Sequence, residues 1–121
     1  MNWTTPLILV AVFAAFLLYR RSGLISVKDA RDLLKNGALV IDVRTAGEFV
    51  AGHLPFAVNM PLNEIETAIT RRVKQQTQVL LVHCQSGMRS GEARKKLIAM
   101  GYPNVHNLGS YARAVSIVRG K

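Results

Sequence analysis

The sequence predicts an α/β fold in which helices flank a central, mostly parallel sheet. Two observations support this prediction. Short apolar segments alternate along the chain with segments of helical periodicity, which is typical of repeated strand–helix units. The most apolar of the short segments, Val79–Val82, has no polar residue on either face. This pattern is expected of a strand that is covered by helices on both sides of a sheet.

The chain is long enough for one domain and apolar enough to build a core. It has 121 residues, of which 50% are hydrophobic, so a disordered chain is disfavoured. A single cysteine excludes an intramolecular disulfide and a cysteine-based metal cluster. The three histidines show no ligand spacing. We therefore expect no metal ion.

The first 21 residues predict a transmembrane helix with a basic flank. The unbroken apolar run Leu7–Leu18 lies within an apolar stretch at 3–19, which is near the lower length limit for crossing a bilayer. Arg20 and Arg21 follow this stretch and no basic residue precedes it, unlike the pattern of a cleaved secretory signal. The charge asymmetry predicts a single-pass inner-membrane protein whose N-terminus lies outside and whose domain is cytoplasmic.

Residues 22–23 form a linker in this prediction, and residues 24–121 form the domain. Ser26 to Asp29 has the form of a capping box that opens a helix, and Asn63 to Glu66 has the same form. The expected elements, in chain order, are a helix at 26–35, a strand at 39–43, a short helix at 45–50, a strand at 58–60, a helix at 63–74, a strand at 79–82, a helix at 89–100, a strand near 105–106 and a helix at 111–118.

Positive charge is concentrated in the second half of the chain. Residues 67–121 contain ten basic side chains and one acidic side chain, whereas residues 24–66 contain four basic and six acidic ones. A basic surface attracts nucleic acid, anionic lipid or an anionic substrate. No aromatic stacking set and no nucleic-acid-binding motif accompanies the charge, so we expect no nucleic-acid partner.

The only cysteine, Cys84, lies between the strand at 79–82 and the helix that follows. Ligand sites of parallel sheets form at the carboxyl ends of the strands, and the N-terminus of a helix favours an anion there. Backbone N–H groups of the loop, together with the cation of Arg89, would lower the pKa of the thiol. A buried structural cysteine is the alternative interpretation. The position between strand and helix favours a reactive thiolate.

The spacing between Cys84 and Arg89 distinguishes two kinds of chemistry. Cysteine-based phosphatases and related arsenate reductases use Cys-x5-Arg, a loop wide enough to hold a tetrahedral oxyanion. Here the arginine follows the cysteine after four residues, and Ser90 occupies the position that the longer loop would give to arginine. The shorter loop suits a sulfur atom attached to the cysteine.

Four ordered segments resemble the rhodanese (sulfurtransferase) family, and most closely its single-domain, bacterial phage-shock-type members. The loop Cys84-Gln-Ser-Gly-Met-Arg89 resembles the active-site loop of that family. The other matching segments are Asp42-Val-Arg44 with Glu48-Phe49, Gly52-His53-Leu54-Pro55 with Ala57-Val58-Asn59, and Gly101-Tyr102 with 105–109. The resemblance covers about residues 24–110.

This resemblance implies a rhodanese-like fold and a thiosulfate sulfurtransferase-type enzyme. Thiolate Cys84 would take the outer sulfur of thiosulfate or a similar small anionic donor, hold it as a persulfide and pass it to cyanide or a thiol. The persulfide is covalent, so no cofactor is expected. The implied donor-binding residues are those of the loop: Gln85, Ser86, Gly87, Met88, Arg89 and Ser90.

Three further residues are implied to lie beside the loop, namely Asp42, Arg44 and Glu48. They either brace it through a buried ion-pair network or contact the substrate. His83 and His53 are expected to be structural. Two other functions stay open: a rhodanese-like module that binds a partner without catalysis, and a redox-sensing thiol at the membrane.

Overall fold

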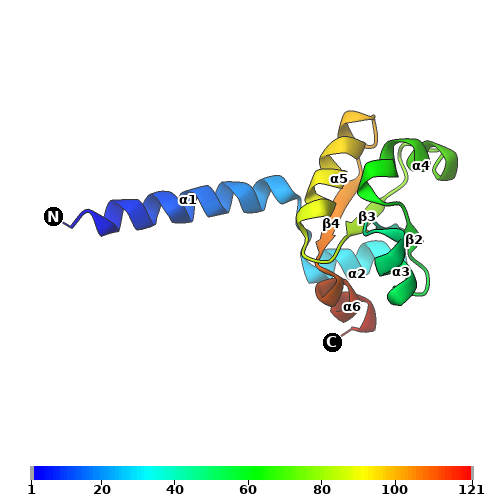
Figure 1. The fold of residues 1–121 in the computed structure, drawn as a ribbon, viewed down its shortest axis with the longest axis horizontal. Helices are drawn as coiled ribbons and strands as arrows, with labels where there is room; N and C mark the ends of the chain where they lie inside the picture. The colour runs from blue at the N-terminus through cyan, green and yellow to red at the C-terminus, as the bar shows by residue number, and fades with distance from the viewer. Residues whose placement is uncertain (1, 121) are drawn as a thin grey trace.

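The computed structural model describes residues 2–120, in which four parallel strands are covered by helices on both faces (Figure 1). The predicted α/β architecture is confirmed. The elements are α1 (Thr4–Ser22), α2 (Val27–Lys35), β1 (Leu39–Asp42), α3 (Ala46–Ala51), β2 (Val58–Asn59), the 3-10 turn η1 (Leu62–Glu64), α4 (Ile65–Arg72), β3 (Leu80–His83), α5 (Met88–Ala99), β4 (Val105–Gly109) and α6 (Tyr111–Arg119).

The sheet has the strand order β2-β1-β3-β4, so β1 and β3 are its central strands. They pair in register, with Val40 opposite Leu81 and Asp42 opposite His83. Because both strands run in the same direction, their carboxyl ends meet at one edge of the sheet. The residues that follow them, Arg44 and Cys84, therefore come together although they are far apart in the sequence.

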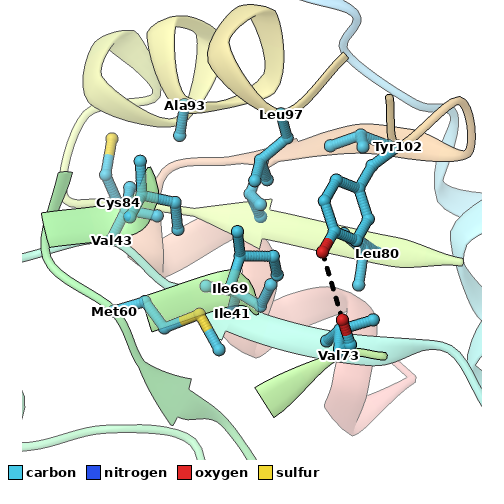
Figure 2. Close-up of a cluster of buried hydrophobic side chains, with 13 residues drawn as sticks. Ile41, Val43, Met60, Ile69, Val73, Leu80, Cys84, Ala93, Leu97 and Tyr102 are labelled. Atoms are coloured by element: carbon cyan, nitrogen blue, oxygen red, sulfur yellow. Dashed lines mark hydrogen bonds between the residues drawn. The ribbon is translucent and has the colours of Figure 1, made fainter. Parts of the chain in front are cut away.

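The two faces of the sheet bury two separate apolar clusters. One face carries Ile41, Leu80 and Val82 beneath α4 and α5, and the other carries Val40 and Leu81 beneath α2 and α6. Figure 2 shows the first cluster, in which the Tyr102 hydroxyl donates a hydrogen bond of 3.1 Å to the carbonyl of Val73. Alternate residues of each strand enter opposite clusters, as the pleat of a strand requires.

The expected cap at Asn63 is wrong. The structure places Asn63 inside the 3-10 turn η1, and the α-helix α4 begins only at Ile65 without a side-chain cap. The turn follows Pro61, whose extended backbone delays the start of the helix. The Ser26 cap is confirmed, because its hydroxyl accepts a hydrogen bond of 3.2 Å from the backbone N–H of Asp29.

The N-terminal helix α1 extends away from the rest of the domain (Figure 1). Over the described residues 2–120, no helix combines the length and the apolar character needed to cross a membrane. The structure therefore does not support the transmembrane helix that the sequence predicts for residues 1–21. α1 contains the unbroken apolar run Leu7–Leu18.

The sequence prediction used the residues that flank this run to anchor the helix in the membrane and to assign its orientation. The side chains of Tyr19, Arg20 and Arg21 lie outside the described part of the structure. The cellular location therefore stays a prediction.

Candidate functional site

The site is built around the junction between β3 and α5. Cys84 directly follows β3, and α5 begins four residues later with Gly87 as its N-cap. Gly87 adopts φ 97° and ψ −10°, a left-handed conformation that glycine tolerates best. This conformation turns the Gly87 N–H toward the sulfur, and the N–H donates a hydrogen bond of 2.9 Å to Cys84 Sγ.

The thiol of Cys84 is acidified by its hydrogen-bond donors. Burial by itself raises the pKa of this thiol. The Ser90 hydroxyl, whose oxygen lies 3.5 Å from Sγ, and the backbone N–H groups of the loop outweigh burial, so the pKa lies below its ordinary value. The backbone donors are those of Ser90, Gly87 and Ser86. These hydrogen-bond donors are the physical cause of the lowered thiol pKa that the sequence predicts.

The sulfur is also shielded from solvent. Cys84 has 0% of its surface exposed, whereas its loop neighbours Gln85, Ser86 and Met88 are exposed. Figure 2 shows Cys84 at the margin of the first apolar cluster, with its sulfur directed away from the other side chains drawn.

Gly87→Ala is expected to raise the pKa of Cys84 and to slow its alkylation at neutral pH. A Cβ in the left-handed region costs about 1 kcal/mol, and relief of that strain turns the Gly87 N–H away from the sulfur. The nearest backbone atoms would lie 3.5 Å from the new Cβ, so the effect arises from φ and not from a clash. The measurement is the pH midpoint of iodoacetamide labelling. Gly47→Ala, within α3, is the control, and equal midpoints in both variants would contradict the prediction.

Arg44 and Asp42 form a buried ion pair beside the loop. The Nη2 atom of Arg44 lies 2.8 Å from Oδ2 of Asp42, and Nε donates to both carboxylate oxygens at 3.0 and 3.1 Å. The backbone N–H of Arg44 also donates to Oδ1. The hydrogen bond to Asp42 is the main cause that raises the pKa of Arg44. Of the two roles left open for this pair, the geometry favours a brace.

The guanidinium of Arg44 connects this pair to the loop. Nη1 donates a hydrogen bond of 3.3 Å to the side-chain oxygen of Gln85, and Nη2 donates one of 2.7 Å to the carbonyl of Gly52. The ring of Tyr111 lies against the guanidinium carbon at 4.3 Å from its centroid. Nε and Nη2 of Arg44 are thus paired with Asp42 and Gly52, while Nη1 holds Gln85 in place.

Arg89 and Glu48 form a second ion pair, at the rim of the site. Nη1 and Nη2 of Arg89 donate to the two oxygens of Glu48 at 2.7 and 3.0 Å. The third predicted supporting residue thus contacts the loop directly. Met88 is 82% exposed, so its side chain faces solvent.

Asn107 is a site residue that the sequence prediction missed. It is buried in β4, and its Oδ1 lies 2.7 Å from the Ser90 hydroxyl and accepts a hydrogen bond of 2.8 Å from the Gly109 N–H. Its Nδ2 donates to the carbonyl of Gly87 at 3.3 Å. A polar residue among the apolar residues of a buried strand is the signal that could have identified it.

His83 precedes the cysteine on β3 and points to the opposite face, as predicted for a structural residue. Its Nε2 lies 3.7 Å from Oδ2 of Asp42, and its ring packs near that of Tyr111. Burial is the main cause that lowers the pKa of His83, so the ring stays neutral. Within residues 2–120, no three His, Cys, Asp or Glu side chains gather as metal ligands would.

Comparison with known proteins gives a consistent match. Residues 26–113 match the rhodanese-like domain family. The chain is 36% identical over 69 residues to thiosulfate sulfurtransferase PspE of Escherichia coli (strain K12), over 57% of this chain and 66% of that protein. It is 31% identical over 101 residues to the thiosulfate:glutathione sulfurtransferase of Homo sapiens, over 72% of this chain and 88% of that protein.

Solved structures agree with these relatives. A rhodanese from E. coli superposes with a TM-score of 0.61 at 32% identity, over 64% of this chain and 91% of that one. The human single-domain sulfurtransferase TSTD1 superposes with a TM-score of 0.68 at 28% identity, over 78% of this chain and 96% of that one. In each case the match covers most of the solved chain.

Proposed function

The chain belongs to the rhodanese-like domain family and is an enzyme of the thiosulfate sulfurtransferase type, and we propose that it transfers sulfane sulfur through a persulfide on Cys84. The observation that carries this proposal is the hydrogen bond of 2.9 Å from the Gly87 N–H to Sγ. This contact, with the Ser90 hydroxyl nearby, lowers the pKa of the thiol. A thiolate is the nucleophile that attack on a sulfane sulfur requires.

The first step conserves atoms and charge. The Cys84 thiolate attacks the outer sulfur of thiosulfate, a new S–S bond forms, and the S–S bond of thiosulfate breaks. Sulfite leaves with the electron pair of the broken bond, and the enzyme retains the persulfide anion. The negative charge stays within the loop, where the backbone N–H groups of Ser86, Gly87 and Ser90 stabilise it.

The second step returns the thiolate. Cyanide or a small thiol attacks the outer sulfur of the persulfide and takes it away, which restores Cys84 for another cycle. The name of the E. coli relative includes thiosulfate, and that of the human relative includes both thiosulfate and glutathione. These names support thiosulfate as the donor and a thiol as one acceptor. The sulfur is carried on the protein itself, so no cofactor takes part in either step.

The proposal is tested by measuring intact mass after incubation with thiosulfate. We expect the protein to gain the mass of one sulfur atom and to lose it again on addition of cyanide or dithiothreitol. A Cys84→Ser variant treated in parallel should show no gain. If the wild-type protein gains no mass while Cys84 is alkylated rapidly at neutral pH, a different sulfur donor or a redox-sensing thiol is favoured. If alkylation is also slow, a binding module is favoured.

A further inference from the structure

The cation that is best placed to bind an anionic donor is already occupied. Arg89 lies in the first turn of α5, and its two terminal nitrogens donate to both oxygens of Glu48. The hydrogen bond to Glu48 is the main cause that raises the pKa of Arg89, and the charge of Cys84 adds a smaller effect. Arg89 follows Cys84 by five positions, at the junction of the loop and α5, but its charge is compensated within the protein.

The carboxylate of Glu48 is also held by Thr45. Its Oε1 accepts hydrogen bonds from the backbone N–H of Thr45 at 3.0 Å and from the Thr45 hydroxyl at 3.2 Å. The Thr45 hydroxyl in turn accepts the N–H of Glu48, which completes a capping box at the start of α3. Arg89 first, and then Thr45, lower the pKa of Glu48 to about 2. The Glu48 carboxylate is therefore negatively charged throughout the neutral pH range.

The ion pair lies where a reactant can reach it. The side chains of Arg89 and Glu48 are 34% and 32% exposed. Arg89 also lines a cavity of about 270 Å³, together with Val43, Thr45, Pro61, Leu62, Asn63 and Lys96. This cavity gives an anion access to Arg89, and the Nζ atom of its second cation, Lys96, lies 3.7 Å from Oε1 of Glu66.

From these contacts we infer that Glu48 is a specificity-determining residue, which makes a dianionic sulfur donor compete with an internal carboxylate for Arg89. The inference rests on the proposed sulfur-transfer function and specifies its donor preference. A donor such as thiosulfate needs a cation for its second negative charge and must displace Glu48 to obtain one. A donor with a single charge, such as an alkanethiosulfonate, lacks that requirement. The intact ion pair therefore shifts the preference of the site toward donors of lower charge.

Glu48→Gln tests this inference, because glutamine keeps the shape of the side chain and can still accept the Thr45 N–H. The variant is expected to lower the KM for thiosulfate about fivefold, on the scale of an exposed ion pair, with little change in kcat. The KM for methanethiosulfonate, which releases methanesulfinate instead of sulfite, is expected to change much less. An equal change for both donors, or a higher KM for thiosulfate, would overturn the inference.

Two further variants control for charge and for shape. Glu92→Gln removes one negative charge from an exposed position of the same helix α5, and it is expected to leave both KM values unchanged. Glu48→Asp keeps the charge but is one methylene shorter, so it cannot maintain both hydrogen bonds from Arg89. Its KM for thiosulfate should fall by a smaller factor than in Glu48→Gln. A parallel thermal melt reports whether each variant is folded.

A measurement without turnover separates this inference from the proposed function. Sulfate is an unreactive dianion, and its binding at Arg89 should protect Cys84 from iodoacetamide. The sulfate concentration that halves the alkylation rate is expected to be about fivefold lower in Glu48→Gln than in the wild-type protein. If no donor forms a persulfide but this shift is seen, the sulfur-transfer function fails and the competition at Arg89 stands. If persulfide forms and the shift is absent, the inference about Glu48 fails.

Discussion

Cys84→Ser is expected to reduce sulfur transfer from thiosulfate by at least about a thousandfold, the scale of losing a covalent nucleophile. The serine hydroxyl stays protonated at neutral pH, and the donors from Ser90 and Gly87 that acidify the thiol cannot produce an alkoxide there. An oxygen at this position also cannot carry a persulfide. The measurement is the initial rate of thiocyanate formation from thiosulfate and cyanide.

The single cysteine makes this test unusually direct. No other thiol exists in the chain, so a second cysteine cannot rescue the variant or carry the sulfur in the wild-type protein. Serine is slightly smaller and keeps an acceptor for the Gly87 N–H, and an unchanged thermal melt would show that the loss is chemical. Transfer within tenfold of the wild-type rate would refute the persulfide mechanism.

Arg44→Met is expected to lower the free energy of unfolding by about 3–5 kcal/mol, because it leaves the buried carboxylate of Asp42 without its cation. The two side chains are 5% and 0% exposed, so solvent does not replace the missing charge. The variant also loses the hydrogen bond to Gln85 and the contact with the Tyr111 ring. Urea denaturation measures the change.

A second substitution identifies the cause of this loss. Asp42→Asn combined with Arg44→Met removes the buried charge as well as its partner, and should recover part of the stability. Arg71→Met, at an exposed position of α4, is the matched control and should change the stability by less than about 0.5 kcal/mol. If Arg44→Met and Arg71→Met behave alike, the ion pair has no bracing role.

The parts of the fold that could be predicted are those that depend on local pattern. Buried parallel strands are continuous apolar runs, so β1 and β3 were found within one residue of their observed ends. The Ser26 cap was found because its hydrogen bond joins residues only three apart. The start of α4 was missed because Pro61 and a 3-10 turn precede it, and the capping pattern at Asn63 carries no information about either.

The N-terminal segment shows where a local pattern is insufficient. The apolar run was recognised and the helix α1 forms there, but no helix of the described residues is long and apolar enough to cross a membrane. Hydrophobicity predicts that a segment avoids water, whereas crossing a bilayer also requires a minimum length.

The sequence by itself determined the position of the thiol, between a buried strand and a helix start, because strand, loop and helix are consecutive in the chain. Only the tertiary structure decided which groups pair with the two arginines of the site. Arg44 is held by Gln85, and Arg89 by Glu48, through contacts that span 41 residues of sequence. Such pairings depend on which strand ends meet at one edge of the sheet, and no local pattern of residues encodes that meeting. The physical reason is that the attraction between two opposite charges depends on their distance in space and not on their separation in the sequence.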